Sequence, residues 1–529
     1  MKLTIIKNIS KILLCGAILL GPTSCKDFLD EEAPSNLTPD NFYTIPDHAE
    51  AALAAVYADM RTVYDGAGIF SSSWQLLEAP TGTSTTETAQ NSDLNNLYGL
   101  NYDGNTQHVI NWWNGLYRVI AQSNQLLSKV PNITPMDEGQ KNRVLGQARF
   151  LRAWAYFNAV RLWGDIPLIT EPQTIESEDF FPTRTPQQEI YNLIVEDLKA
   201  AEASGLPWMD ASGHASMAAV KSELARVYLT MAGQPLNKGA EYYKLAADKA
   251  FEVITYANAN PSVINLFQTY YEVHSEATEN KVEHIFMLQY NNVVAGNPME
   301  NMYPNFKPVT YNGPGGTGST IPTPAFYASY EPGDLRAKNQ EGYFYTSYYT
   351  NGNGDEFQLG APYIFKHFNL TSSGTVITKI EPNGTITKTS VNGTRNNNLN
   401  VPQIRYAEVL LIYAEAQNEV GGPTVDTYEA INKVRRRAKI PELNGLSQQQ
   451  FREAVWQERW HELCYEQITW FDMVRLRKVY NETTKGFDDF VGHVNKSSNQ
   501  PLTAKNLLFP VPVPEIRNNS NLTQNPDYK

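Results

Sequence analysis

The strongest constraint on the fold is a set of helix-length segments in which apolar residues recur every three or four positions. In residues 185–207, Ile190, Ile194 and Leu198 fall on one face of a helix. The same pattern recurs in residues 47–64, 216–233 and 242–254. Helices of this length joined by short breaks are typical of tetratricopeptide-like arrays, in which each hairpin packs on its neighbours. The sequence therefore predicts a mainly α fold with a tetratricopeptide-like helical hairpin scaffold.

Capping residues indicate where two of these helices begin. Asp47 followed by Glu50 has the spacing of a capping box, and Thr185 followed by Gln188 repeats that spacing. Such a pair satisfies backbone N–H groups that have no partner inside the helix. We therefore expect Asp47 and Thr185 to be N-cap residues.

The middle of the chain, residues 291–402, is rich in Gly, Asn, Tyr and Pro and lacks the helical pattern. A span of this length without helices is usually functional in a compact domain. Within it, residues 375–390 alternate in polarity on each side of Asn383-Gly384, which is a strong hairpin signal. We therefore predict a loop-rich variable region that contains small β-hairpins.

The pattern divides the chain into a scaffold and a variable part. The helical scaffold is expected over about residues 40–290 and 403–480. Residues 505–529 are predicted to be extended, because their prolines fix φ and remove backbone donors. Together these parts predict a single mature domain over residues 25–529.

Residues 1–24 have the pattern of an export signal. Lysines among the first eleven residues precede an apolar run at residues 12–20, which is too short to cross a bilayer as a helix. The segment ends at Cys25, and this arrangement resembles the lipobox of bacterial lipoproteins, where the signal is cut before a lipid-bearing cysteine. We therefore predict Cys25 to be a lipid anchor. The alternative is a conventional secretory signal followed by an incidental cysteine.

Composition excludes several classes of function. The net charge is −13 and the chain has no basic block, which argues against binding nucleic acid. Besides Cys25, the mature chain contains Cys464 alone, so neither a disulfide framework nor a cysteine-rich metal site is expected. We predict no cofactor and no metal. The 30 tyrosines suit a neutral ligand, which flat aromatic rings can cover.

Two stretches imitate catalytic motifs. Residues 313–320 have the glycine spacing of a phosphate-binding loop, but Ser319 stands where that loop needs a lysine. His461-Glu462 begins like a zinc-protease helix, but Tyr465 stands where the second histidine belongs. We expect neither a nucleotide site nor a zinc site.

Three carboxylates need a separate explanation, because a glycoside hydrolase requires only two. Glu458, Glu462 and Glu466 are spaced by four residues and share one helix face. Acids alone at this spacing would repel one another. Nearby arginines therefore predict a structural ion-pair network, with the candidates Arg459, Arg475 and Arg477. No catalytic pair stands out, and we predict that the protein is not an enzyme.

Several segments resemble the RagB/SusD family of Bacteroidetes outer-membrane lipoproteins. The resemblance is clearest in ARFLRAWAYFNAVRLWGDIPLI, residues 148–169. The other matching segments are residues 25–43, 184–198, 404–422, 431–443, 457–475 and 507–528. These matches occur in the order found in the family and cover nearly all of the mature chain.

The resemblance implies a surface-exposed lipoprotein of the outer membrane that captures oligosaccharides without chemistry of its own. Its implied partner is a SusC-like TonB-dependent transporter. Acidic residues soon after the lipid-bearing cysteine resemble a surface-export tag of the family, here Asp27, Asp30, Glu31 and Glu32. The alternative is a peptide-binding surface lipoprotein, since some relatives serve peptide uptake and a tyrosine-lined groove suits peptides too.

The family also suggests which residues contact the ligand, because its contacts tend to come from the loop after the first long helix and from the variable middle. Aromatic rings there would stack on the apolar face of a sugar, while amides and carboxylates bind its hydroxyls. The predicted stacking residues are Trp74, Tyr98, Tyr102, Tyr303 and Tyr311. The predicted hydroxyl-binding residues are Asp93, Asn95 and Asn101. By contrast, Trp154, Trp163 and Trp456 have apolar helical surroundings and are expected to lie in the core.

Overall fold

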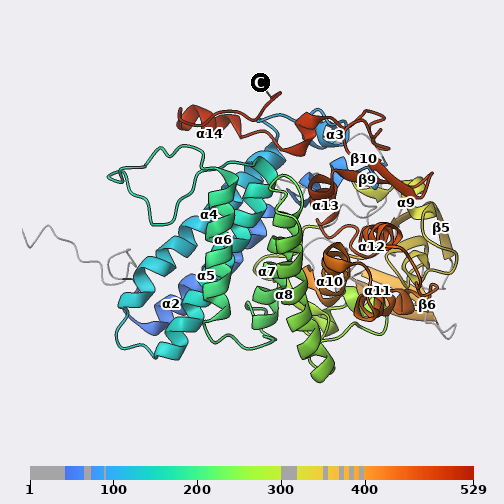
Figure 1. The fold of residues 1–529 in the computed structure, drawn as a ribbon, viewed down its shortest axis with the longest axis horizontal. Coiled ribbons are helices and arrows are strands. Elements are labelled where there is room, and N and C mark those ends of the chain that lie inside the picture. Colours follow the sequence, from blue (N-terminus) through green and yellow to red (C-terminus); the bar gives the residue numbers. More distant parts are fainter. Residues whose placement is uncertain are drawn as a thin grey trace, which may run out of the picture.

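The computed structural model describes most of the chain from residue 42 onward (Figure 1). The described residues are 42–64, 73–87, 91–299, 318–349, 356–367, 375–380, 386–391 and 398–528. They form a mainly α fold with small antiparallel sheets, as the sequence predicts.

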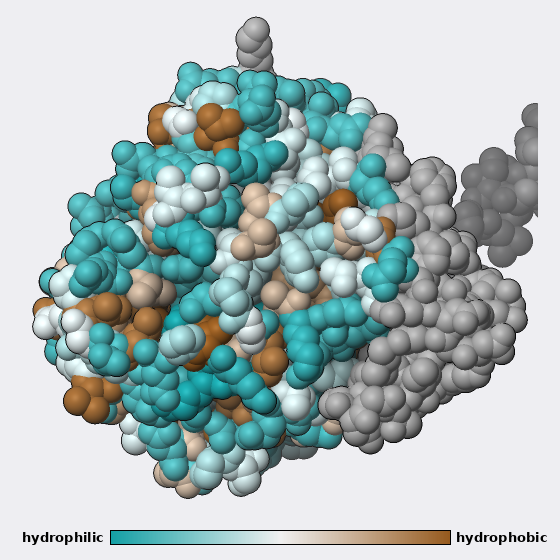
Figure 2. Space-filling view, turned by 90° about the vertical axis from the view of Figure 1, so that its right-hand side faces the viewer, coloured by the Kyte–Doolittle hydropathy of each residue, from teal (hydrophilic) through white to brown (hydrophobic). Residues whose placement is uncertain are grey.

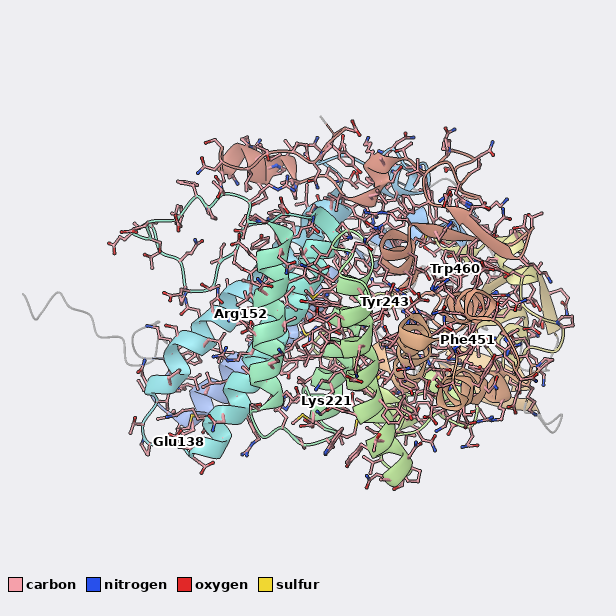
Figure 3. The ribbon with its side chains drawn as sticks, in the orientation of Figure 1. Glu138, Arg152, Lys221, Tyr243, Phe451 and Trp460 are labelled. Carbon is pink, nitrogen blue, oxygen red and sulfur yellow. The ribbon has the colours of Figure 1, made fainter. Side chains whose placement is uncertain are left out.

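Packed helical hairpins build the N-terminal half. Its helices are α2 (Pro46–Asp59), α3 (Ser92–Tyr98), α4 (Gln107–Lys129), α5 (Glu138–Trp163), α6 (Gln187–Glu202), α7 (Met217–Ala232) and α8 (Ala240–Ala259). From α4 to α8, each helix packs against the next one along the chain. A buried ion pair adds to this packing, since Arg152 Nε in α5 lies 2.7 Å from Asp197 Oδ2 in α6 (Figure 3). The predicted hairpin scaffold is confirmed.

The C-terminal half contains a second group of helices. They are α10 (Tyr406–Gly421), α11 (Val425–Ala438), α12 (Gln448–Glu462) and α13 (Thr469–Leu476), with the short helices α9 (Pro324–Ala328) and α14 (Val513–Asn518). Helix α10 packs against α7 and α8 on one side and against α11 and α12 on the other, which joins the two halves. Helix α14 lies in the segment predicted to be extended, so that prediction is wrong for its six residues.

Antiparallel strands occupy much of the variable region. β4 (Phe344–Tyr349), β5 (Glu356–Ile364), β6 (Thr375–Ile380) and β7 (Ile386–Val391) form a sheet in the order β5-β4-β6-β7. The predicted hairpin is confirmed, because β6 pairs with β7 from Thr375↔Val391 to Ile380↔Ile386. Its turn, Asn383-Gly384, lies outside the described residues. Two-stranded pairs join β2 (His284–Leu288) to β8 (Val401–Arg405), and β9 (Lys478–Asn481) to β10 (Gly486–Asp489).

Both N-cap predictions are wrong. Asp47 lies in the first turn of α2, and the N-cap residue of that helix makes no side-chain hydrogen bond. Helix α6 begins at Gln187, with Pro186 rather than Thr185 in the N-cap position. The Gln187 N–H donates instead to Asp165 Oδ1 at 2.9 Å. A carboxylate from the preceding connection therefore caps the helix, and the local sequence around residue 185 does not reveal it.

The tryptophans divide between the core and its edge. Trp154 and Trp163 are buried, as predicted. Trp456 is half-buried and lines a surface hollow of about 390 Å³ with Tyr243 and Phe487, so its assignment to the core is wrong.

On the face that carries the variable region, hydrophilic residues predominate and hydrophobic ones lie in small groups (Figure 2). Among the described helices, none combines the length and apolarity needed to span a bilayer.

The three spaced carboxylates of α12 and its C-terminal end are buried in an ion-pair network. Glu462 is central to this network. Its Oε1 atom lies 2.6 Å from Arg437 Nη2 and 3.1 Å from Arg405 Nη1. These cations hold the pKa of Glu462 at about 2, although burial alone would raise it. The prediction of a structural network is therefore confirmed.

The partners in this network differ from the predicted ones. Glu458 pairs with Arg336 and Arg435, and Glu466 pairs with Arg405 and Lys366. The three arginines proposed from the sequence have other contacts. Arg459 and Arg475 both pair with Asp472, and Arg477 donates to the Val474 carbonyl oxygen. Partners far apart in sequence replace the nearby ones, because the fold brings α11, β8 and residues 334–336 against α12.

Candidate ligand-binding site

The structure joins the two segments that the sequence selected for ligand contacts. β1 (Ser84–Thr85) pairs antiparallel with β3 (Ile321–Pro322). One step further, the Glu87 N–H donates to the Gly318 carbonyl oxygen at 2.8 Å. Residues that are more than 200 positions apart therefore form one continuous ladder. We call residues 73–87, 91–103 and 318–322 the loop frame.

Buried polar side chains hold this frame together. Gln75 Nε2 donates to Ser319 Oγ at 3.1 Å and to Thr320 Oγ1 at 2.8 Å. The Tyr98 hydroxyl donates to the Ser319 carbonyl oxygen at 2.8 Å. All four residues are buried, so these bonds are shielded from water and position the backbone on both sides of the frame.

The hydrogen bonds from Gln75 also involve the end of residues 313–320, the stretch that imitates a phosphate-binding loop. Its described end, residues 318–320, has both side-chain hydroxyls turned into the protein, where they accept bonds from Gln75. Ser319 and Thr320 are fully buried. This end of the stretch therefore serves as a structural anchor of the frame.

Three of the predicted stacking rings lie inside the protein. Trp74, Tyr98 and Tyr102 are 0%, 5% and 1% exposed. Tyr102 packs on Phe509 with ring centroids 4.9 Å apart, and its hydroxyl accepts a bond from Asn506 Nδ2 at 3.1 Å. A buried ring presents no face for a sugar to cover, so the expected exposure of these rings is wrong. Aromatic residues in a polar, glycine-containing stretch here anchor the loops to the core.

The other residues predicted to contact the ligand lie either near the protein surface or outside the described residues. Asn95 and Asn101 are exposed and Asp93 is half-buried, all three in or next to α3 at the rim of the frame. Tyr303 and Tyr311 lie outside the described residues, as does the predicted lipid anchor Cys25. The structure thus leaves the three polar candidates accessible to a ligand.

Sequence reasoning missed the polar residues that build the frame. Gln75 lies between Trp74 and Leu76, and a polar side chain inside such an apolar run is a signal for a buried hydrogen bond. Tyr363 adds a second link, because its hydroxyl donates to Glu87 Oε1 at 2.9 Å. This link ties β5 to the frame, and no local pattern around residue 363 points to it.

One acid in the frame has a strongly perturbed pKa. Burial raises the pKa of Glu78 to about 8, although its Oε1 atom accepts a bond from the Gln467 N–H at 2.7 Å. Perturbed acids often mark reactive sites. Glu78 is fully buried, however, and its accepted bond joins the frame to the residues before α13. Its position therefore indicates a structural contact.

Within the described residues, no group of three or more His, Cys, Asp or Glu is placed to hold a metal ion.

A helical-hairpin scaffold that carries a hydrogen-bonded loop frame with an accessible polar rim is an arrangement that suits a binding protein. The SusD family model matches residues 282–528, and a second model, described as starch-binding associating with outer membrane, matches residues 27–229. The chain belongs to the SusD family. SusD-like proteins are binding proteins without catalytic activity, and we describe this chain as one of them.

Individual relatives agree with this assignment over almost the full chain. A SusD superfamily protein from Parabacteroides distasonis is 31% identical, with a TM-score of 0.81 over 93% of this chain and 100% of its own. SusD-like protein P2 from Formosa agariphila is 27% identical over 97% of this chain and 98% of its own length. A laminarin-binding SusD-like protein has the same fold, with a TM-score of 0.67 at 22% identity over 91% of this chain and 99% of its own.

Proposed function

We propose that this protein captures oligosaccharides at the cell surface for a partner SusC-like TonB-dependent transporter of the outer membrane. The observation that carries the proposal is the loop frame. It joins the first loop to the variable region on a rigid scaffold in a chain of the SusD family. The name of the laminarin-binding relative supports a glycan as the ligand class.

The physical basis of capture is a stable platform beneath neutral, amphipathic loops. The buried bonds of the frame limit how far its two segments can move apart, which lowers the entropy that binding must remove. We propose Tyr303 and Tyr311 as rings that stack on the apolar face of a sugar. Asp93, Asn95 and Asn101 are proposed to bind hydroxyl groups.

We further propose that residues 1–24 are an export signal and that residues 25–529 form one mature domain anchored through lipid on Cys25. Support comes from the lipobox-like sequence and from the description of the family model that begins at residue 27. Acyl chains contribute roughly 0.8 kcal/mol per buried CH₂, so a lipidated cysteine would hold the domain at a membrane surface. The loop frame would then act outside the cell.

Calorimetric titration of the purified mature protein tests the ligand class. The panel contains laminarin, starch and other neutral oligosaccharides, with a mixed peptide pool as the competing class. We expect saturable binding of at least one glycan and no binding of the peptides. The glycan should keep its chain length after overnight incubation. Binding of peptides alone would establish the alternative function, and release of shorter sugars would contradict the proposal.

Variants of the same protein locate the site. Tyr303→Ala combined with Tyr311→Ala is expected to lower glycan affinity about tenfold or more, which corresponds to about 1.4 kcal/mol. Tyr243→Ala is the matched control, because Tyr243 (labelled in Figure 3) is a half-buried tyrosine of α8 that lines the hollow beside Trp456, which contains no residue of the frame. Its affinity should equal that of the unmodified protein. An equal loss in both variants would remove the support for the loop site.

Cys25→Ala separates the anchor from the domain. The variant is expected to leave the membrane fraction, because its N-terminus can no longer carry diacylglycerol. Its melting temperature and glycan affinity should not change, since the described helical core begins at residue 46. Fractionation followed by thermal unfolding measures both properties. A variant that stays in the membrane fraction, or one that unfolds, would contradict the proposed role of Cys25.

A further inference from the structure

A cavity that shares no residue with the loop frame lies between the two halves of the protein. It has a volume of about 310 Å³ and is bounded by the ends of α5, α6, α7 and α13 and by the C-terminal segment. That segment crosses the top of the molecule in Figure 1. The wall is mainly apolar and includes Val160, Phe471, Val474, Leu507 and Leu508. A partly open cavity of this size with a mainly apolar wall suits a small organic molecule.

Arg161 is a cation in the wall of this cavity. Its guanidinium carbon lies 3.7 Å from the centre of the Phe157 ring and 3.6 Å from the centre of the Phe471 ring. Arg161 Nε donates to the Phe157 carbonyl oxygen at 3.0 Å, and Nη2 donates to Asn158 Oδ1 at 2.9 Å. Because rings cover both faces of the guanidinium, a ligand can approach it only along its edge.

The charge of Arg161 lacks a carboxylate partner within the part of the chain that the structure describes, where no ion pair to it is closer than 4 Å. Burial lowers its pKa to about 9, and the carboxylates of Glu223 and Glu408, which lie beyond ion-pair distance, offset this effect only in part. A neighbouring arginine of the same wall is different, since Arg475 pairs with Glu415 and Asp472. Of these two arginines, Arg475 is held in ion pairs and Arg161 is not.

Two further cations extend this positive region. Arg477 is half-buried, and its Nη1 donates to the Val474 carbonyl oxygen at 2.7 Å. Lys505 lies with its Nζ 4.4 Å from the centre of the Tyr528 ring. Among the described residues, neither cation forms an ion pair, and Asp527 is the one carboxylate of the wall. A cavity whose wall carries more cations than carboxylates is unusual for a chain whose net charge is −13.

We propose that this cavity binds an organic anion that has one carboxylate on an apolar body. The carboxylate would accept charge-assisted hydrogen bonds from the free edge of Arg161, and the body would lie against the apolar wall. Such a ligand compensates a charge that is otherwise costly to keep in a partly desolvated site. The site is independent of glycan capture at the loop frame.

Calorimetry with 3-phenylpropionate, its neutral amide 3-phenylpropanamide and sodium sulfate tests this proposal on the full mature protein. We expect 3-phenylpropionate to bind at a single site, at least about tenfold more tightly than the amide, because the charge-assisted bonds are lost in the amide. Sulfate, which has no apolar body, should bind more weakly than 3-phenylpropionate. Equal affinity for the two aromatic probes, no binding of either, or tighter binding of sulfate would overturn the proposal.

Variants of the protein test whether the preference for the carboxylate over the amide arises in this cavity. Arg161→Gln should abolish the difference between carboxylate and amide, whereas Arg118→Gln should preserve it. Arg118 is the control because it is an exposed arginine of α4 whose side chain is 60% exposed. If Arg161→Gln fails to fold, Arg477→Gln is measured instead, with an expected loss of carboxylate affinity of about threefold or more. A carboxylate preference that survives in the folded variant would overturn the assignment.

Discussion

Replacing Glu462 with glutamine is expected to lower the free energy of unfolding by about 3–5 kcal/mol, the range for breaking a buried ion pair by removing one partner. Glu462 is fully buried, and its carboxylate contacts Arg405, Arg437 and Arg336. Its Oε1 also accepts a bond from the Tyr343 hydroxyl at 2.8 Å. Glutamine has a similar shape but turns an uncharged amide toward three cations, which then lack a central counter-charge.

Equilibrium unfolding in urea measures the effect, and Glu453→Gln is the matched control. Glu453 is an exposed acid of the same helix, α12, so its replacement should change the free energy of unfolding by less than about 0.5 kcal/mol. Equal stability of Glu462→Gln and the unmodified protein would show that the network does not stabilise the fold.

The same substitution should change the response to acid. The folded pKa of Glu462 is about 2, below its ordinary value of 4.5, so its ionised form stabilises the fold above pH 4.5. That contribution is lost as the pH falls from 4.5 through about 2. The stability difference between the unmodified protein and Glu462→Gln should therefore shrink over this interval. A difference that stays constant from pH 7 to pH 3 would contradict the assigned pKa.

Trp163→Ala is expected to cost about 3–5 kcal/mol of unfolding free energy, the usual range for emptying a buried tryptophan site. Trp163 ends α5 and is fully buried. Its ring packs edge-on against Trp113 with centroids 4.9 Å apart, and its Nε1–H donates to the Pro510 carbonyl oxygen at 2.9 Å. The substitution leaves a cavity and an unpaired carbonyl between the scaffold and the C-terminal segment.

Trp163→Phe distinguishes the two contributions. Phenylalanine retains much of the ring packing but cannot donate to Pro510, so we expect a smaller loss of about 1–3 kcal/mol. Thermal and urea unfolding of both variants provide the comparison. Equal losses in Trp163→Phe and Trp163→Ala would assign the effect to the hydrogen bond, and no loss in either would contradict the core position of this residue.

Local patterns in the sequence were sufficient for most of the secondary structure. The apolar spacing around Ile190 and Ile194 predicts α6, and the run from residue 404 predicts α10, because one helix face must be buried. The alternating segments around residues 375–390 predict the β6–β7 hairpin, since its signal lies within one short stretch. In each of these cases the physical cause is close in sequence to its effect.

Features that depend on distant contacts could not be predicted in this way. The Asp165 side chain caps α6, and Arg437 and Arg405 rather than Arg459 compensate Glu462. Trp74 is a buried anchor, and Gln467, far along the chain, donates to its carbonyl oxygen. Burial and ionic partners are properties of the assembled fold, so composition around a residue is a poor guide to them.

A crystal structure of the mature protein with an oligosaccharide that it binds tests the central claim most directly. The claim is that this protein holds an uncharged glycan over the loop frame and leaves it intact. We predict continuous density for the whole oligosaccharide beside Asn95 and Asn101, with tyrosine rings against the sugar faces. Density for a cleaved product, or for a ligand bound away from the frame and held by cations, would contradict it.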